Sequence, residues 1–336
     1  MQNGPTFESS ASPRRLLIID GHAFAYRAFF AIRSLSSPSG TPTNAIYGFI
    51  RMLAKALERL APTHVAVIWD GGLDQERTTL LPEYKAQRPE MPSDLRCQLD
   101  PIQAYLGASH VFSLLQESCE ADDCIASMTR QAAEAGMEVV IASSDKDFMQ
   151  LVSPKVRLLN PHDKSDTLCD VECVKRKTGV EPTQIVDWLS LIGDSVDNIP
   201  GVKGVGPKTA TDLLRQFSSI DGLLRRLPEI GSARLRVNLE ASAELMRRNQ
   251  QLVRLKDETP CEVAMEVLSI KSCDYDALRQ LYSGWGFKTL LSELEQARRM
   301  SEDFFNGSGG GESHGVVTAG ASDRQSKEIM DKSNTF

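Results

Sequence analysis

The sequence of 336 residues has few cysteines and histidines, and their spacing favours neither a zinc site nor a disulfide framework. Its seven cysteines are an odd number, and no two of them form a C-x-x-C pair. Cys169 and Cys173, near His162, form the only cluster, and metal binding there is a weaker interpretation than buried thiols. We therefore expect reduced, buried cysteines.

Long apolar runs are also absent. No segment approaches the roughly 20 apolar residues that a membrane-spanning helix needs. Residues 1–13 are polar and lack the apolar core of a secretory signal peptide. These absences lead us to expect an intracellular protein in the cytoplasm, with no membrane partner.

The sequence also has no excess of basic residues over acidic ones. The chain has 38 Lys and Arg against 45 Asp and Glu, a formal net charge of −7. Many proteins that bind nucleic acid are basic overall, so this balance argues weakly against such a partner. The objection does not apply if the acids are concentrated in a metal site and the bases lie elsewhere.

The apolar residues that are present indicate an α/β fold. Three runs typical of fully buried strands, LLIID, HVAVIWD and MEVVIASSD, occupy residues 16–20, 64–70 and 137–145. Helical patterns separate them. We predict a central, mostly parallel sheet flanked by helices over residues 14–177.

The remainder of the chain has a different composition. Residues 178–302 show helical patterns alone, and basic side chains recur along them. Residues 1–13 and 303–336 are polar, with few large apolar side chains, and we expect both ends to be disordered.

Each predicted strand ends at or just before an aspartate: Asp20, Asp70 and Asp145. Any one of them would be explained by capping of the following helix. Parallel sheets, however, place their active sites outside the carboxyl ends of the strands. Three aspartates at three strand ends therefore favour a shared site.

Six further acids extend this pattern, at the start of a predicted helix, after the third strand and in a turn closed by Asn198 and Pro200. Close carboxylates repel one another unless solvent or cations neutralise them. The six are Glu120, Asp122, Asp123, Asp147, Asp194 and Asp197.

All nine acids offer oxygen ligands, without His or Cys. That donor set favours Mg²⁺ or Mn²⁺ over zinc. Two such ions, about 3.5 to 4 Å apart, would activate water and stabilise the leaving oxygen of a phosphodiester. A single structural Ca²⁺ is the weaker alternative, because one ion does not need nine acids.

A glycine-rich turn follows the last two acids. Its glycine spacing matches a nucleotide-binding P-loop, but Pro207 has no amide to give a phosphate. The pattern favours a helix-hairpin-helix over residues 184–217, gripping a phosphodiester backbone without reading bases. A plain turn between packed helices is the alternative. The candidate DNA-contacting residues of the turn are Gly201, Lys203, Gly204, Gly206, Lys208 and Thr209.

With these residues assembled, the chain from about Arg15 to Phe287 resembles the 5′-nuclease domain of bacterial DNA polymerase I. That domain belongs to the flap endonuclease superfamily, with a PIN-like α/β core. Six stretches carry the resemblance, in the family's order and spacing: IDGHAFAYRAFFA, TPTNAIYGFIRML, LPEYKAQRPEMP, EADDCIA, SDKDFMQLV and GDSVDNIPGVKGVGPKTA. We expect a free-standing nuclease, unless the chain is a piece of a longer polymerase.

The resemblance implies two groups of metal ligands among the nine acids. The first ion would be held or neighboured by Asp20, Asp70, Glu120 and Asp122. The second would be served by Asp123, Asp145, Asp147, Asp194 and Asp197. It also implies Mg²⁺ as the ion, with Mn²⁺ as a substitute, and K⁺ at the helix-hairpin-helix.

The resemblance further implies that residues 73–97 form a helical arch over the site. Lys85 and Arg88, three apart on one helix face, would contact the scissile phosphate, with Arg77 as a further catalytic cation. Tyr84 would stack on a terminal base. Because acids balance bases in this segment, a solvated mobile loop is the alternative.

The implied function is removal of primers or flaps in replication and repair, by 5′-3′ exonuclease and 5′-flap endonuclease activity. The implied partners are nicked or branched duplex DNA, an RNA–DNA hybrid and a DNA polymerase in trans. We expect a monomer near the bacterial nucleoid. Two departures from the family, Glu76 for a common aromatic residue and Ser144 for the usual Gly, remove no ligand. The alternative is a non-catalytic protein that binds branched DNA.

Overall fold

The structure is a computed structural model that describes residues 14–163, 167–259, 261 and 263–307. The leader that we expected over residues 1–13 lies outside the described residues, as does the tail from 308 onward. Residues 303–307, which we also assigned to that tail, belong instead to the end of a helix. Within the described ranges, no helix is long and apolar enough to cross a membrane.

The chain folds as two compact units whose segments alternate along the sequence. Unit 1 contains the nine acids and the glycine-rich turn, and unit 2 is built from helices. Of the described residues, unit 1 comprises those in the ranges 14–23, 62–90 and 113–269, and unit 2 comprises those in the ranges 24–61, 91–112 and 270–307.

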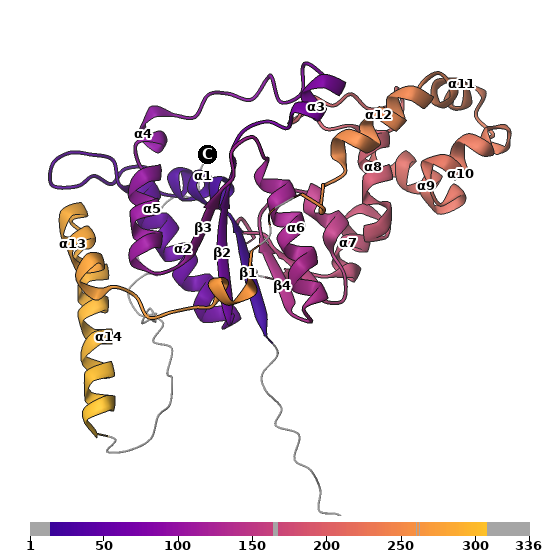
Figure 1. Ribbon diagram of the computed structural model, residues 1–336. Coiled ribbons are helices and arrows are strands. Elements are labelled where there is room, and N and C mark those ends of the chain that lie inside the picture. Colours follow the sequence, from indigo (N-terminus) through magenta and orange to yellow (C-terminus); the bar gives the residue numbers. More distant parts are fainter. Residues whose placement is uncertain (1–13, 164–166, 260, 262, 308–336) are drawn as a thin grey trace, which may run out of the picture. The chain divides into compact units, whose positions relative to one another are not determined.

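A six-stranded sheet in the order β3-β2-β1-β4-β5-β6 forms the centre of unit 1 (Figure 1). β1 pairs in parallel with β2 and β4, β4 pairs in parallel with β5, and β6 runs antiparallel to β5. The three strands predicted from the sequence are confirmed as β2, β1 and β4, which are neighbours. The strands are β1 (Arg15–Asp20), β2 (His64–Trp69), β3 (Phe112–Leu115), β4 (Glu138–Ala142), β5 (Val156–Leu159) and β6 (Leu168–Cys169).

The central strands are apolar on both faces, and this composition explains their position. Leu16 to Ile19 of β1 are fully buried, and every residue of β2 is buried. Strands without a polar face need cover on both sides, which parallel sheets provide. Ile19 lies opposite Ala142, and Asp20 lies opposite Ile68, so the carboxyl ends of the three strands meet at one edge.

Helices form the rest of unit 1, as the change of pattern near residue 178 predicted. α8 packs against α9 and α12, and Figure 1 shows α8 to α12 gathered together in pink to orange. Trp188 Nε1 donates to Thr211 Oγ1 at 3.2 Å and so links α8 to α9. The helices are α3 (Gln75–Leu80), α6 (Ala121–Glu134), α7 (Val171–Thr178), α8 (Ile185–Ile192), α9 (Pro207–Phe217), α10 (Ile220–Arg225), α11 (Ala233–Ala241) and α12 (Ala243–Val253), with 3₁₀ turns η1 (Asp147–Leu151), η2 (Pro182–Gln184), η3 (Leu227–Glu229) and η4 (Met265–Leu268).

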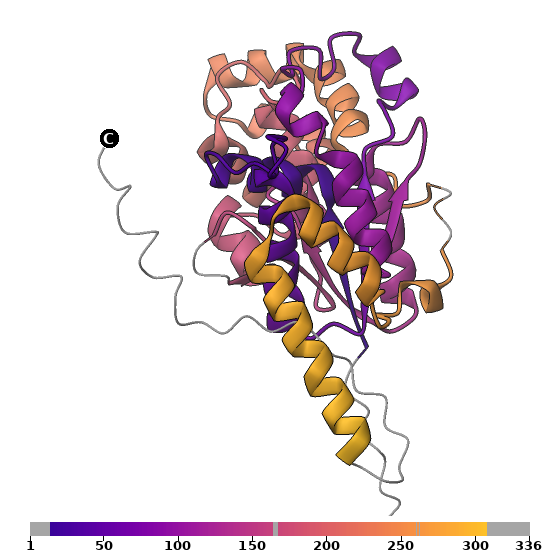
Figure 2. The same ribbon diagram turned by 90° about the vertical axis from the view of Figure 1, so that its left-hand side faces the viewer.

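Unit 2 is a group of helices, of which α13 and α14 pack together at the C-terminal side (Figure 2). The buried Asn44 amide donates to Phe29 O and Ile32 O, both at 2.9 Å, and so caps the end of α1. Arg51 pairs with Glu293 at 2.8 Å and joins α2 to α14. The helices are α1 (Gly21–Ala31), which begins in unit 1, α2 (Asn44–Leu60), α4 (Ser93–Arg96), α5 (Leu99–Ala108), α13 (Tyr275–Trp285) and α14 (Lys288–Gly307).

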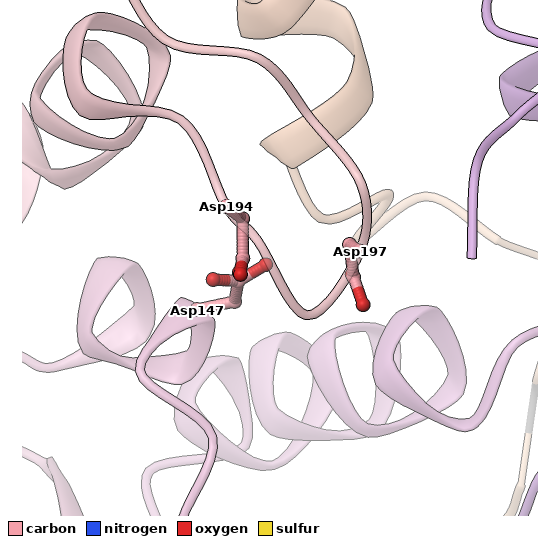
Figure 3. Close-up of side chains that lie close together, drawn as sticks. All are labelled: Asp147, Asp194 and Asp197. Carbon is pink, nitrogen blue, oxygen red and sulfur yellow. The ribbon is translucent and has the colours of Figure 1, made fainter. Parts of the chain in front are cut away.

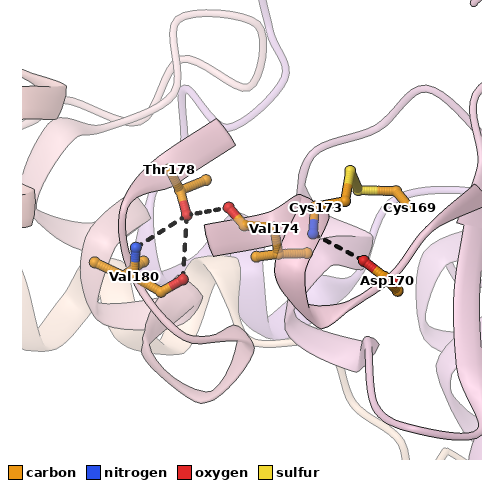
Figure 4. Close-up of a disulfide and its surroundings, with 6 residues drawn as sticks. All are labelled: Cys169, Asp170, Cys173, Val174, Thr178 and Val180. Atoms are coloured by element: carbon orange, nitrogen blue, oxygen red, sulfur yellow. Dashed lines mark hydrogen bonds between the residues drawn. A yellow bond between two sulfur atoms is a disulfide. The ribbon is translucent and has the colours of Figure 1, made fainter. Parts of the chain in front are cut away.

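The expectation of reduced cysteines is wrong for one pair. Cys169 and Cys173 form a disulfide between the end of β6 and the first turn of α7 (Figure 4). The turn around Asp170, whose carboxylate accepts from Cys173 N at 2.9 Å, brings the two Cα atoms to 5.1 Å. That separation suits a disulfide. The other five cysteines are free thiols.

Candidate functional site

Asp20 and Asp70 lie at the carboxyl ends of β1 and β2, and Asp145, three residues beyond the end of β4, interacts electrostatically with Asp20. Asp20 Oδ1 accepts from Ala23 N at 3.0 Å, and its Oδ2 accepts from Ser143 Oγ at 2.9 Å. Ser143 follows β4, so this bond connects the ends of two adjacent strands. Asp70 Oδ1 accepts from Ala121 N at 3.1 Å and ties the end of β2 to the start of α6.

The start of α6 brings three more acids to this edge. Glu120 is the N-cap residue, and Asp122 and Asp123 lie in the first turn, where negative charge is favoured by the helix dipole. Glu120 Oε2 accepts from Lys85 Nζ at 2.6 Å and from Tyr84 OH at 3.1 Å. Glu120 is therefore held by the segment that precedes α6 in the sequence.

Asp147, Asp194 and Asp197 form a cluster that could hold a metal ion (Figure 3). One carboxylate oxygen of each lies within 4.8 Å of the others. Asp147 Oδ1 is buried and has no hydrogen-bond partner, which is costly unless a cation or water binds there. An all-oxygen group with an unsatisfied buried oxygen fits a hard divalent cation.

A tight turn aims Asp194 and Asp197 into this cluster. Asp194 and Ile199 exchange backbone hydrogen bonds of 2.8 and 2.7 Å, and Asp194 Oδ1 accepts from Val196 N at 2.9 Å. Gly193 and Gly201 flank the turn and pass so close that a Cβ at Gly201 would lie 2.2 Å from Ile192 O. Side chains at these two glycines would push the turn apart.

The charges at this edge shift the acidity of four carboxyls. Burial, with help from Asp145 and Asp70, raises the pKa of Asp20 to about 6. Burial also raises the pKa values of Asp122, Asp145 and Asp147, and neighbouring carboxylates add to the effect in each case. Each of these four carboxyls therefore holds its proton more readily than a free aspartate does, as expected where buried carboxylates lie close together.

Cations offset that charge on one side. Lys85, with a side chain only 3% exposed, lies 3.8 Å from Asp122 and 4.0 Å from Asp197 besides its contact with Glu120. Arg88 pairs with Asp197 at 2.6 Å. Burial alone would raise the pKa of Glu120, but Lys85 and Arg77 hold it below its ordinary value.

The segment that carries Lys85 differs from the predicted helix. Residues 82–87 form turns, and Lys85 has a positive φ of 56°, so Lys85 and Arg88 do not share a helix face. Lys85 N donates to Asp197 O at 3.0 Å, and Asn198 Nδ2 donates to Glu83 O at 2.9 Å. These tertiary bonds to the turn that carries Asp194 and Asp197 replace the helical bonds. Of the predicted arch, only the short helices α3 and α4 are formed.

Tyr84 is 4% exposed, and its hydroxyl is engaged with Glu120. Its ring lies under the Lys85 ammonium, 5.0 Å from the ring centroid. In this conformation the ring contacts the site rather than solvent. Stacking of Tyr84 on a base stays a prediction that would require the turn to open.

Arg77 is 1% exposed, whereas we expected it to be a further catalytic cation. It forms a bidentate pair with Asp123 at 2.7 and 2.8 Å and donates to Leu252 O and Arg254 O at 3.0 and 2.8 Å. Arg77 thus joins α3 and α6 to the C-terminal end of α12. Both oxygens of Asp123 are engaged by this arginine.

Sequence reasoning missed three residues that support the site. Lys146 Nζ lies 3.2 Å from Asp194 Oδ2, and its place between Asp145 and Asp147 was the available signal. Asn249 is fully buried on α12 and donates to Ser190 O and Pro200 O at 3.0 and 2.8 Å. Ser143 orients Asp20. No local pattern marks Asn249 or Ser143.

The glycine-rich turn, which we predicted to bind a phosphate, is partly exposed. Val202 and Val205 are buried and anchor it, whereas Lys203, Gly204 and Lys208 are exposed. Gly204 has a φ of +82°, which favours glycine. α9 begins at Pro207, directly after the turn. Gly206 is the N-cap residue of α9, and the half-buried Thr209 is its third residue. The turn thus presents free amides and two ammonium groups to solvent.

Comparison with known proteins identifies the family. Residues 15–179 match a model described as the N-terminal resolvase-like domain of 5′-3′ exonuclease, and residues 180–276 match its C-terminal SAM fold. A 5′-3′ exonuclease of Aquifex aeolicus is 37% identical over 288 residues, covering 86% of this chain and 98% of that protein. The chain belongs to the 5′-3′ exonuclease family. Membership of this family shows nuclease function. It favours a catalytic protein over the alternative of one that binds DNA without cleaving it.

Other relatives of this 5′-3′ exonuclease are longer. DNA polymerase I of Bacillus subtilis is 37% identical over 286 residues, which are 84% of this chain but 32% of the polymerase. A structure of T5 5′-exonuclease with divalent metal ions (zinc) bound has a TM-score of 0.61 at 25% identity, covering 80% of this chain and 97% of that one. A bacteriophage T5 flap endonuclease complex with DNA and metal ions scores 0.59 at 21% identity, covering 84% and 100%. This second likeness shows the fold alone.

The burial of Arg77 predicts a structural role. Arg77→Ala should lower the free energy of unfolding by about 3 to 5 kcal/mol, because it leaves Asp123 as an unpaired buried charge. Arg88→Ala, which removes a half-exposed partner of Asp197, should cost about 1 kcal/mol or less. Urea denaturation of both variants measures the difference. Equal losses would contradict the structural role of Arg77.

The raised pKa of Asp20 predicts a pH-dependent stability without divalent ions. Between the ordinary value of 3.8 and about 6, the folded protein binds more protons at Asp20 than the unfolded chain. The free energy of unfolding therefore falls as pH rises through this window. In EDTA, the Tm advantage of Asp20→Asn over the wild type should grow between pH 4 and pH 7. A difference independent of pH would show that Asp20 titrates normally.

Proposed function

We propose that this 5′-3′ exonuclease is a Mg²⁺-dependent, structure-specific nuclease that also cuts 5′ flaps. Its products would carry a 5′-phosphate and a 3′-hydroxyl. The observation that carries the proposal is the convergence of Asp147, Asp194 and Asp197, with the unsatisfied Asp147 oxygen, beside the aspartates at the strand ends. A structural site for one ion does not require so many unneutralised carboxylates.

The donor set supports Mg²⁺, with Mn²⁺ as a substitute, because hard cations prefer oxygen ligands. Asp20, Asp70 and Asp122 would serve one ion, and Asp145 with the Asp147 cluster a second. When bound, two such ions supply charge stabilisation and a water nucleophile for phosphodiester hydrolysis. The T5 5′-exonuclease structure with zinc bound supports divalent ion use in the family. We include K⁺ at the glycine-rich turn in the proposal.

Two acids have a different proposed role. The oxygens of Glu120 and Asp123 are engaged by Lys85 and Arg77. We assign Asp123 to positioning α6 through Arg77, and Glu120 to holding Lys85 beside the site. Both assignments differ from the ligand roles that the family resemblance implied for these acids.

Lys85 and Arg88 are the proposed catalytic cations. Both lie against Asp197, next to the acidic cluster, where a scissile phosphate would approach. Arg88 is half exposed and free to turn towards a phosphate. Lys85 would neutralise negative charge from its buried position beside the acids. Arginine suits the outer position because its fork binds phosphate oxygens in pairs.

The exposed glycine-rich turn is the proposed duplex grip. Lys203, Lys208 and the free amides of α9 would hold one phosphodiester backbone without reading its sequence. The same chain segment carries Asp194 and Asp197, so it fixes the distance between grip and cut. Structures of a T5 flap endonuclease and of the catalytic core of Rad2, which have a similar fold, contain DNA, and this supports DNA as the substrate. We extend the proposal to RNA–DNA hybrids, a polymerase in trans and a monomer at the bacterial nucleoid.

A cleavage assay tests the nuclease proposal. A 5′-labelled flap duplex with Mg²⁺ should yield products cut at the flap junction, and EDTA should abolish the reaction. Asp147→Asn should lower kcat at least 10²-fold while DNA affinity changes little, because it removes one charge from the cluster. Asp100→Asn, at an exposed position of α5, is the matched control. Binding without cleavage by the wild type would favour the non-catalytic alternative.

Salt dependence tests the grip. Lys208→Ala should weaken duplex binding and reduce the slope of log K against log salt by about 1, the effect of one lost phosphate contact. Lys155→Ala makes the same charge change at an exposed lysine away from the turn and should leave the slope unchanged. Equal slopes for both variants would remove Lys208 from the DNA contact.

A further inference from the structure

Two free thiols lie in contact across the start of α6. The sulfur atoms of Cys119 and Cys124 are 3.0 Å apart. Because Glu120 is the N-cap, Cys119 is the residue before the cap and Cys124 is the fourth helical residue. Side chains at these two positions often pack together and fix the angle at which the chain enters the helix. Here the pair encloses the acids Glu120, Asp122 and Asp123.

Both thiols sit on restrained backbone. Cys119 O accepts from Gly71 N at 3.0 Å, which ties it to the loop that carries Asp70. Cys124 is part of α6. Cys119 is 9% exposed and Cys124 is 1% exposed, so only a small oxidant can reach them. Cys261, 3% exposed, also lies within hydrogen-bonding distance of Cys124.

We propose that Cys119 and Cys124 are an oxidative modification site, whose disulfide inactivates the nuclease; the functional consequence rests on the function proposed above. With hydrogen peroxide as oxidant, the Cys119 thiol attacks one peroxide oxygen and gives a sulfenic acid and water. The Cys124 thiol then attacks the sulfenic sulfur, the S–S bond forms, and a second water leaves. Two thiols and one peroxide thus give one disulfide and two waters. A dithiol reductant reverses the change by disulfide exchange.

The geometry explains why the bond would affect cleavage. A disulfide requires about 2.05 Å between sulfurs, roughly 1 Å less than the present contact. The two side chains and the helix start share this contraction, and the helix start carries Asp122 and the Glu120 contact with Lys85. Misplacement of a reacting group by about 1 Å costs on the order of 10²-fold in rate. The bond should therefore act on turnover more than on DNA affinity.

The Cys169–Cys173 disulfide would complicate the interpretation of a redox experiment, because a reductant acts on this pair as well as on Cys119 and Cys124. The background for the test is therefore the double variant Cys169→Ala/Cys173→Ala. In this background, five thiols remain. The first measurement is peptide mapping by mass spectrometry after treatment with hydrogen peroxide and blocking of free thiols. A Cys119–Cys124 linkage is expected; its absence, or a Cys124–Cys261 linkage in its place, overturns the proposal.

The second measurement is flap cleavage before oxidation, after it and after dithiothreitol. We expect at least a tenfold loss and full recovery. Cys124→Ala in the same background should keep its activity under peroxide, whereas Cys261→Ala, the matched buried control, should lose it like the parent. Loss of activity in Cys124→Ala, or unchanged activity in a parent that carries the mapped linkage, overturns the proposal. If the reduced parent itself cleaves nothing, the proposed function fails, and the mapping still decides whether the linkage forms.

Discussion

Repulsion among acidic side chains is the constraint on which the rest of unit 1 depends. Nine carboxylates meet at one edge of a parallel sheet, and burial makes their charges costly. The chain neutralises part of this charge itself, with Lys85 and Arg77 around Glu120 and Asp123. It leaves Asp20, Asp122, Asp145 and Asp147 without full compensation, and their pKa values rise. The fold therefore holds a group of crowded carboxyls that the proposed divalent cations would neutralise.

Burial separates the roles of three cations that look equivalent in the sequence. Arg77 is enclosed and satisfied by a carboxylate and two helix-terminal carbonyls. Lys85 is equally buried but faces the acids of the site. Arg88 is half exposed and can exchange Asp197 for another anion. The degree of burial and the partners thus separate a structural residue, Arg77, from Lys85 and Arg88, which contact the acids of the site. All three lie within twelve positions of one another.

The segment from Gly193 to Ala210 connects the acidic edge to the proposed DNA grip. Gly193 and Gly201 let its two arms pass at backbone distance, and Asn249 fixes it from α12 through Pro200 O. Lys85 N and Asn198 join it to the turn that carries Lys85. A shift in this segment would therefore move Asp194, Asp197, Lys85 and the proposed grip together.

The sequence by itself determined the α/β class, the three central strands and the glycine-rich turn, and it marked nine acids whose role as one site stays a prediction. Each of these depends on short-range patterns: apolar runs, acids at the ends of strands and glycine spacing. Only the tertiary structure decided that Arg77 is buried, that Lys85 lies in a turn and not on a helix, and that Cys169 and Cys173 are bonded. Those outcomes depend on partners far along the chain, such as Asp123 for Arg77 and Asp197 for Lys85, or, for the cysteines, on how one turn is folded. A local sequence pattern shows which residues are charged, but tertiary packing decides which of these charged side chains are buried together.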